Sequence, residues 1–419
     1  TPVTFSSIIK DESLLSIFIK FGLQRKETRH DDFTPDYYLH ILYQPGSARF
    51  PAGIRLACYV RGASGSRLFC RGIISMIIAG GTIISSFFSE KIIRRLGTGP
   101  VTAISVFMTA AALLGFSLSH SAWLLCILAV PYGLGAGSVD AALNNFVALH
   151  YKAHHMSWLH CFWGIGATAG PFIMSLCLNT GKRWHSGYMT IALIQIILTV
   201  FLFLSLPLWK KQQAGTASEE NGAQNTSLSF SRVLQLPGAK PALLCFFGYC
   251  ALEASAGLWG SSYFVLAKGI PAEKAAQWTS LFYFGITFGR FISGFLSMKV
   301  SDKNMVRLGQ AVALIGILVL CLPFGPLSIC GGYFLIGLGC APIYPSLLHA
   351  TPANFGREYS QAIMGIQMAC AYVGSTFMPP LFGLIAQYVN IRLFPCFLLL
   401  FVILMVITAE KLKIKSEVS

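Results

Sequence analysis

The sequence predicts an all-α membrane protein built from two helical bundles that repeat one another. Three observations lead to this fold class: an apolar composition, a series of long apolar segments, and short motifs that recur at fixed distances. The chain has 419 residues, of which 54% are hydrophobic and 11% are charged, and its mean hydropathy is +0.63. Soluble domains contain about 25% charged residues, so this composition excludes an ordinary soluble enzyme or nucleic-acid-binding protein.

Eleven apolar segments from Gly72 onward are each long enough to cross a hydrocarbon core of about 30 Å as a helix. A polar stretch at 210–240 separates the first five from the last six and is predicted to be a cytoplasmic linker. We therefore expect an N-terminal bundle at 72–209, a C-terminal bundle at 241–411 and a tail at 412–419. The predicted spans are 72–89, 100–119, 121–144, 157–179, 187–209, 241–267, 277–298, 306–323, 326–350, 361–388 and 391–409.

The formal net charge of +15 indicates membrane topology rather than nucleic-acid binding. From Gly72 onward, 21 Lys and Arg residues stand against 10 Asp and Glu, nearly all between apolar segments. Fifteen of these basic residues fall in one set of loops and five in the other, and cytoplasmic loops carry the basic excess. We therefore expect a multi-pass protein of the plasma membrane with its C-terminus in the cytoplasm. The basic residues of the opposite loops are Lys182, Arg183, Lys268, Lys274 and Arg392.

The two halves of the chain share motifs. The residues Ser-Glu-Lys at 89–91 and Arg-Leu-Gly at 95–97 recur 212 residues later as Ser-Asp-Lys at 301–303 and Arg-Leu-Gly at 307–309. The Gly-Leu-Gly motif at 133–135 recurs 204 residues later at 337–339. Parallel repeats of six helices with a basic loop after the second helix are typical of the major facilitator architecture. That architecture requires twelve helices, so helix 1 is predicted to be absent or corrupted.

Residues 1–71 contain no spanning segment and are left out of the fold prediction. One interpretation is a disordered N-terminal extension. A sharper hypothesis is that the part from about His30 to Arg71 is mistranslated in the wrong reading frame. A one-base shift then allows an apolar helix that starts with Met, contains an Asp and continues into Gly72. The nucleotide sequence tests this hypothesis, because the absence of an open shifted frame excludes it.

Away from the span ends, three charged residues lie inside predicted spans, where charges are costly and usually serve a function. Asp140, in the fourth of the twelve helices, is predicted to couple protons, because a buried carboxyl can bind a proton on one side and release it on the other. Glu253, in helix 7, is a second candidate for this role. For both acids, a structural hydrogen bond to a neighbouring helix is the alternative. Arg290 is interpreted as an anchor near the cytoplasmic end of helix 8.

Amide and aromatic side chains accompany these charges. Asp140 and Asn144 share one face of their helix, as do His160 and Trp163 in the next span. An indole ring stacks on a pyranose, while amides and a carboxylate bind its hydroxyl groups. Each residue alone is commonly a packing residue, but together they predict a sugar site. The predicted sugar-binding residues are Asn144, Asn145, His160, Trp163, Trp259 and Gln367.

Charged residues at the helix ends that face the basic loops form a predicted cytoplasmic gate. Such side chains can pair in one conformation and separate in the other; a role in topology alone is the alternative. The gate residues are Glu90, Arg94, Arg95, Arg290, Asp302 and Arg307.

We expect no metal and no cofactor. The cysteines lack the spacing of metal ligands, and no phosphate-binding loop with its lysine occurs. The cluster of His150, His154 and His155 is interpreted as part of a solvated loop.

Three stretches carry a family resemblance: GAGSVDAALNNF at 135–146, WLHCFWG at 158–164 and GCAPIYP at 339–345. On these motifs the chain from Gly72 to about Lys411 resembles the fucose–proton symporter family of the major facilitator superfamily, and within it the glucose/mannose permease-like members. The resemblance implies proton-coupled sugar transport, with Asp140 as the family's helix 4 carboxylate and Asn144 close to the Asn that follows it.

The resemblance also shows departures from the family pattern. Trp163 stands where the family has a sugar-binding Asn in helix 5, and His160 stands for a nearby Gln, so fucose itself is not implied as the substrate. The family's second essential acid, an Asp in helix 1, has no match in the chain except in the shifted reading frame. The polypeptide as written is therefore expected to be transport-incompetent.

The sequence thus predicts a secondary active transporter, not an enzyme, which takes up a hexose-like sugar by alternating access with protons or sodium. We expect a monomer in the lipid bilayer, with a small-molecule solute and no nucleic-acid partner. The alternatives are a drug or metabolite efflux transporter of the same fold, a membrane sensor, and a non-functional product of a frameshifted gene. A sensor requires a signalling domain, for which the linker at 210–240 is too short and too polar.

Overall fold

The computed structural model describes residues 66–119, 121–179, 184–217 and 230–412. Within these ranges the long elements are helices, and no β-strand occurs. Residues 1–65, which include most of the segment of about 30–71 proposed to be frame-shifted, lie outside the described residues. The first described helix begins at Ser66, which is earlier than the predicted boundary at residue 72.

Five helices form the N-terminal half. They are α5 (Ser66–Leu96), α6 (Thr98–Leu118), α7 (Ala122–His150), α8 (Ala153–Asn179) and α9 (Trp184–Ala217). Gly97 has a φ of 84°, a left-handed conformation that glycine adopts without strain, and it allows the sharp turn from α5 into α6.

The C-terminal half follows the short helix α10 (Phe230–Gln235). Its long helices are α11 (Ala239–Lys268), α12 (Ala272–Leu296), α13 (Asp302–Cys321), α14 (Pro326–His349), α16 (Arg357–Ile385) and α17 (Phe394–Leu412). The short helix α15 (Thr351–Phe355) joins α14 to α16, and the turns η2 (Ala386–Asn390) and η3 (Ile391–Leu393) join α16 to α17.

Eight segments of the described chain are long and apolar enough to cross a membrane, where the sequence predicts eleven spans. The predicted number is therefore not confirmed. Two of the predicted spans fall in α8 and α12, which are not among these eight segments. Two others fall in one continuous helical segment, Arg357–Leu412.

The repeated Gly-Leu-Gly motif lies at equivalent helix contacts in the two halves. A methyl group on Gly133 of α7 would overlap the carbonyl oxygen of Ile78 in α5, and one on Gly337 of α14 would overlap that of Phe282 in α12. Thr82 also donates a hydrogen bond to the Gly133 carbonyl at 3.2 Å. Small residues let helix backbones approach closely in a membrane, so the repeated motif is explained by packing.

The halves repeat one another in their packing as well. Helix α7 contacts α5 and α6, and α6 contacts α9; in the same way α14 contacts α12 and α13, and α13 contacts α17. Helix α11 lies against α12, α16 and α17. In the repeat, α5, α8 and α9 correspond to α12, α16 and α17. Among the described residues, no helix of the N-terminal half packs on α5, α8 and α9 as α11 packs on their counterparts.

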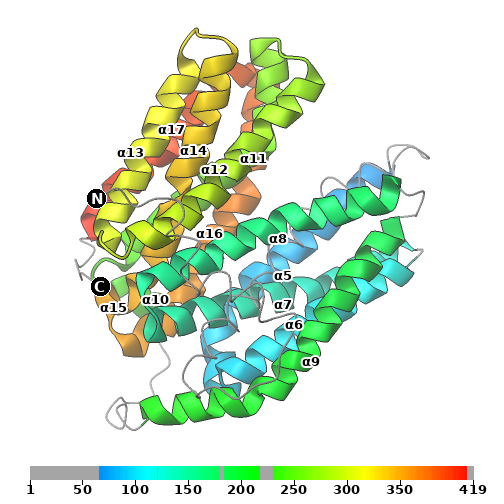
Figure 1. The fold of residues 1–419 in the computed structure, drawn as a ribbon, viewed down its shortest axis with the longest axis vertical. Helices are drawn as coiled ribbons and strands as arrows, with labels where there is room; N and C mark the ends of the chain where they lie inside the picture. The colour runs from blue at the N-terminus through cyan, green and yellow to red at the C-terminus, as the bar shows by residue number, and fades with distance from the viewer. Residues whose placement is uncertain (1–65, 120, 180–183, 218–229, 413–419) are drawn as a thin grey trace, which may run out of the picture.

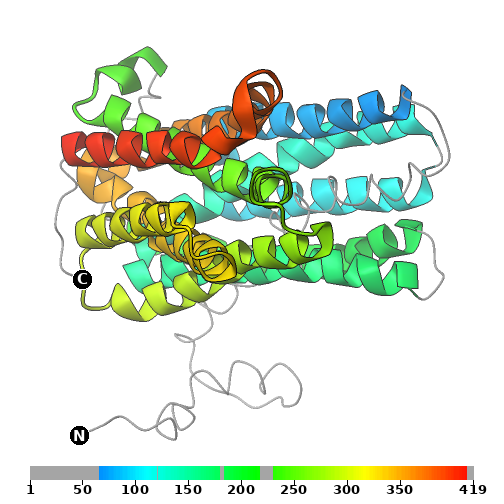
Figure 2. The ribbon, with the colours of Figure 1, turned by 90° about the horizontal axis from the view of Figure 1, so that it is seen from above.

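The two halves meet through α5 and α7 against α16, and through α8 against α12 and α14. From the end where α10 and α15 lie, the bundles diverge (Figure 1). Seen from above, most helices of both halves run along a common direction, as spans of one membrane do (Figure 2). We call the inter-half contacts near the C-terminal ends of α7 and α14 the seam.

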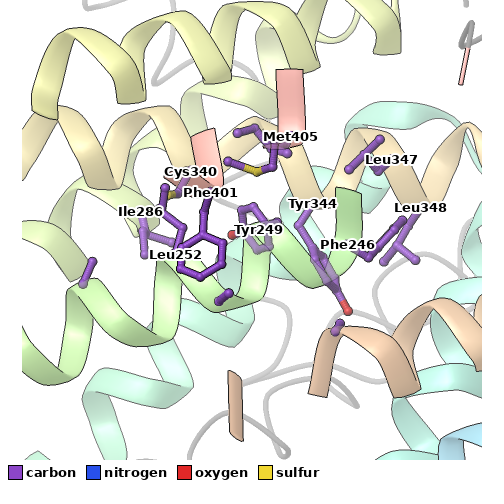
Figure 3. Packing of buried hydrophobic residues seen from close by; sticks show 14 of the residues in the cluster. Phe246, Tyr249, Leu252, Ile286, Cys340, Tyr344, Leu347, Leu348, Phe401 and Met405 are labelled. Atoms are coloured by element: carbon purple, nitrogen blue, oxygen red, sulfur yellow. The ribbon is translucent and has the colours of Figure 1, made fainter. Parts of the chain in front are cut away.

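The core of the C-terminal half is aromatic where it faces the other half. Tyr249 of α11 and Tyr344 of α14 lie with their ring centroids 5.4 Å apart, and Phe246 packs on Tyr344 at the same distance. Figure 3 shows these three rings beside Leu252, Ile286 and Met405. This packing fixes the two tyrosine rings next to the charged residues described below.

Candidate functional site

Asp140 joins the two halves of the protein. Its side chain is 7% exposed and accepts a hydrogen bond at Oδ2 from the hydroxyl of Tyr372 in α16. One turn further along α7, the buried Asn144 donates from Nδ2 to the Asp140 carbonyl at 2.9 Å and to its Oδ1 at 3.3 Å. Helical spacing therefore places the amide beside the carboxylate, whereas the tyrosine comes from a helix 232 residues away.

His160 extends this chain of hydrogen bonds into α8. Its Nε2 lies 3.0 Å from Oδ1 of Asn144. Because the Asn144 nitrogen is already directed at Asp140, the oxygen accepts and His160 donates from Nε2. The imidazole ring packs edge-on against Tyr344, with centroids 5.1 Å apart. A continuous polar chain thus runs Tyr372–Asp140–Asn144–His160, starting and ending against the C-terminal half.

Arg290 forms the centre of a second polar group that also spans both halves. The guanidinium lies 3.7 Å from Oε1 of Glu253 and donates to the Tyr249 hydroxyl at 3.3 Å. It also stacks over the ring of Trp163 in α8 at 4.7 Å and donates to the His160 carbonyl at 3.3 Å. Arg290 is only 2% exposed, and a buried charge of this kind requires a partner, which Glu253 supplies.

The structure therefore places Arg290 with the predicted coupling and sugar-binding residues rather than with the gate at the helix ends. Glu253, predicted as a second coupling acid, is held as the partner of this arginine. Trp163 is half-buried, with one face against the guanidinium. The backbone of α8 at His160 links the two polar groups, since the ring contacts Asn144 and the carbonyl contacts Arg290.

Three other predicted sugar-binding residues have their polar atoms bonded within the protein. Asn145 accepts from the Ser360 hydroxyl at 2.6 Å, and Gln367 accepts from that of Thr351 at 3.1 Å. Trp259 donates from its indole nitrogen to the Pro379 carbonyl at 2.8 Å. Asn145 lies at the seam, and Trp259 bridges α11 and α16 within the C-terminal half.

The predicted gate residues form ion pairs within each half. Glu90 and Arg94 pair at 3.5 Å within α5, and Arg95 beside them is exposed. Arg307 binds Glu410 through two bonds of 2.6 and 2.7 Å. The carboxylate of Asp302 binds His349 of α14 at 2.7 Å.

The histidine cluster lies at helix ends rather than in a fully solvated loop. His150 is the last residue of α7, and His154 and His155 lie in the first turn of α8, all half-buried. Burial, followed in effect by the charge of His154, lowers the pKa of His155 to about 4. No group of metal-ligating side chains occurs in the described ranges.

Tyrosines are the members of this candidate site that the sequence analysis did not predict. Tyr372, Tyr249 and Tyr344 each lie in an apolar helix, where a hydroxyl needs a hydrogen-bonding partner. That requirement is a signal in principle, because a Tyr inside a span points to a second polar residue nearby. It does not identify the partner, which is supplied by packing between helices.

A helical membrane protein with two repeated bundles and buried polar groups between them has the architecture of a secondary transporter. The family model "Major Facilitator Superfamily" matches residues 71–278 and 242–415. The chain belongs to this superfamily of membrane transporters, which are not enzymes.

Individual relatives agree with this assignment. The chain is 25% identical over 355 residues to the transporter y4wD of Sinorhizobium fredii, covering 82% of this chain and 88% of y4wD. It is 22% identical to the glucose/mannose transporter GlcP of Bacillus subtilis, covering 67% and 70% of the two chains. The fold is similar to that of FucP in the outward conformation, with a TM-score of 0.69 and 16% identity over 90% of this chain and 98% of FucP.

Proposed function

We propose that this transporter takes up a neutral hexose together with a proton by alternating access. The observation that carries the proposal is the hydrogen bond from Tyr372 to Asp140, which ties a buried carboxyl to the opposite half of the protein. The similarity to GlcP supports a hexose as the solute. The plasma membrane, a cytoplasmic C-terminus and a monomeric state belong to the same proposal.

Asp140 is the proposed proton-binding group. An ionised carboxylate accepts stronger hydrogen bonds than a neutral one, so its contact with Tyr372 favours the packing of α7 on α16, while its contact with Asn144 orients the carboxylate within α7. Protonation weakens both bonds and loosens the tie between α7 and α16. Glu253 is a less suitable coupling group, because its charge is already matched by Arg290 at 3.7 Å. Sodium as the coupling ion is the alternative.

Trp163, His160 and Asn144 form the proposed sugar site, since they offer a ring face, an imidazole and an amide within one connected group. Arg290, seated on Trp163, orients the indole ring. Asn145, Trp259 and Gln367 require rearrangement before they bind a solute, because protein groups occupy their hydrogen-bonding atoms.

Export of an anionic metabolite is the second candidate. The observation that favours it is the buried Arg290, whose Nε atom has no hydrogen-bond partner in the described part of the chain. An anionic solute would then replace Glu253 as the partner of the guanidinium. The neutral sugar is preferred because the existing ion pair leaves Arg290 electrically satisfied.

The test uses the full-length chain in proteoliposomes with an acidic exterior and labelled glucose, mannose and an organic dicarboxylate. Accumulation of a hexose that depends on the pH gradient is expected. Asp140→Asn is expected to abolish accumulation but retain exchange of labelled for unlabelled sugar, while Glu358→Gln, the same change at an exposed acid, retains both. Undiminished uphill uptake by the Asp140 variant contradicts the role of this carboxyl, and uptake of the dicarboxylate alone favours the second candidate. Absence of all uptake by the full-length chain contradicts the proposed function and favours the alternative of a transport-incompetent polypeptide.

A further inference from the structure

The seam contains two contacts that occupy equivalent positions in the repeat. Asn145 near the end of α7 and His349 at the end of α14 are 204 residues apart, the same interval as the Gly-Leu-Gly motifs. Asn145 accepts a hydrogen bond from Ser360 of the other half at 2.6 Å. His349 contacts the Tyr151 carbonyl of the other half, with Nε2 at 3.3 Å from the oxygen. One contact involves a neutral amide, and the other involves a titratable ring.

The two ring nitrogens of His349 both face oxygen atoms. Nδ1 lies 2.7 Å from Oδ2 of Asp302, and Nε2 faces the Tyr151 carbonyl. A carbonyl oxygen only accepts, and so does an ionised carboxylate. A neutral imidazole has a single N–H, so it cannot donate to both. Either the ring carries both protons, or Asp302 is protonated and donates to Nδ1.

In both arrangements the pair of side chains holds one more proton than an ionised Asp302 beside a neutral His349. Loss of that proton removes a donor from one of the two contacts. The shorter contact with Asp302 at 2.7 Å is the stronger, so the bond lost is the one to Tyr151, which is the bond between the halves. Asp302 Oδ1 is buried and has no partner in the described part of the chain, which leaves its carboxylate dependent on His349.

We propose that His349 and Asp302 form a second proton-binding site, distinct from Asp140, and that the proton bound there fastens the seam. At the end of the protein that the topology assigns to the cytoplasm, acidification then holds the seam closed and alkalinisation releases it. The effect on transport rests on the proposed function, whereas the pH dependence of the seam does not.

Other charged and titratable groups lie around His349 and could compete with it for the proton. The charged and titratable residues on the packed elements are Asp302 on α13 with its sequence neighbour Lys303, the residues Lys152, His154 and His155 at the start of α8, and Arg357 on α16, which donates to the Leu149 carbonyl. Burial is the main cause that lowers the pKa of His154 and of His155, the latter to about 4. These two rings are therefore neutral near neutral pH and do not replace His349 as the proton acceptor.

Hydrogen–deuterium exchange of the full-length chain in detergent, without solute, tests the proposal. Peptides covering 145–155 and 349–360 report on the seam at about pH 6 and about pH 8. After correction for intrinsic exchange rates, the wild type is expected to exchange about ten-fold more slowly at the lower pH, the size typical of a charge-assisted hydrogen bond. His349→Asn, which places the amide of the Asn145 position in this site, is expected to show equal rates at both pH values.

Two further variants make the outcome unambiguous. In Asp302→Asn, the amide can donate to Nδ1 of a neutral ring, so the seam is expected to stay protected at both pH values. His185→Asn is the matched control, because His185 contacts the Ser119 carbonyl away from the seam, and it keeps the wild-type response. A pH response that survives in His349→Asn, or none in the wild type, overturns the proposal. The outcome does not depend on sugar uptake, so failure of the proposed function remains separately detectable.

Discussion

Tyr372 donates its hydroxyl proton to Asp140 across the boundary between the two halves of the transporter. The two residues lie on α16 and α7, which contact each other at this boundary. The bond is the direct connection between the proposed proton site and the opposite half. A change in the charge of Asp140 therefore alters a contact between α7 and α16, two helices of opposite halves.

Replacement of Tyr372 by Phe tests the strength of this connection. The change removes one donor from a buried carboxylate, and loss of a partner by a buried polar group typically costs about 1–3 kcal/mol. We expect a melting temperature several degrees lower and weaker coupling of uptake to the pH gradient. Tyr388→Phe is the control, because Tyr388 is 77% exposed. Equal melting temperatures for the two variants would contradict a contribution of the Tyr372 hydroxyl.

The part of the site that depends on helical spacing was predictable from the sequence. Asp140 and Asn144 are four residues apart, and the predicted common face is the one on which they bond. The contacts of Tyr372 with Asp140 and of Arg290 with Trp163 were not predictable, because no local period relates residues more than a hundred positions apart. Arg290 looked like an anchor at a helix end because its position in the helix does not reveal which helix covers it.

The fold was predictable to the level of the superfamily for a similar reason. Apolar length and the repeated motifs are properties of single segments, and Gly133 and Gly337 do lie at equivalent helix contacts. The predicted number of spans is not confirmed, because α8 and α12 are not among the eight segments and two predicted spans fall in one continuous helical segment. The predicted reading-frame change concerns a segment, about 30–71, of which the structure describes only residues 66–71, and it stays a prediction.

The buried pair of Arg290 and Glu253 is expected to behave as a unit. Removing one member of a buried ion pair typically costs about 3–5 kcal/mol, because the other charge is left uncompensated. Arg290→Gln and Glu253→Gln should each lower the melting temperature strongly. The double variant should lose less than the sum of the two single losses.

Thermal unfolding of the purified protein measures this coupling. Lys299→Gln, at an exposed position beyond α12, controls for loss of a positive charge and should change the melting temperature little. Additive losses in the double variant would show that the two side chains stabilise the fold independently.

The close contact of α5 with α7 gives a steric prediction. Gly133→Ala places a methyl group on the carbonyl oxygen of Ile78, whereas a methyl group at Gly80 has no heavy atom within 4 Å. Overpacking typically costs about 1–3 kcal/mol, while Ala in an open helical position gains up to about 1 kcal/mol over Gly. The two substitutions should therefore shift the melting temperature in opposite directions, and a loss of equal size from both would contradict the packing argument.

His155 gives a prediction about stability and pH. In the folded protein burial lowers its pKa to about 4, from an ordinary value of 6.5. Below 6.5 the unfolded chain binds a proton at this ring while the folded protein does not, so unfolding is favoured as the pH falls. Above about pH 6.5 this ring therefore does not lower the free energy of unfolding. Between about pH 6.5 and pH 4 the free energy of unfolding falls progressively as the pH falls.

The measurement is the melting temperature of the purified protein across this window of pH. His155→Gln removes the titrating ring, so its melting temperature should fall less steeply with acidification than that of the wild type, by a difference of a few degrees. His185→Gln, at the other end of the bundle, should keep the wild-type slope. A wild-type slope in the His155 variant would mean that other groups account for the acid sensitivity, such as carboxyls that the folded protein keeps ionised below their ordinary pKa.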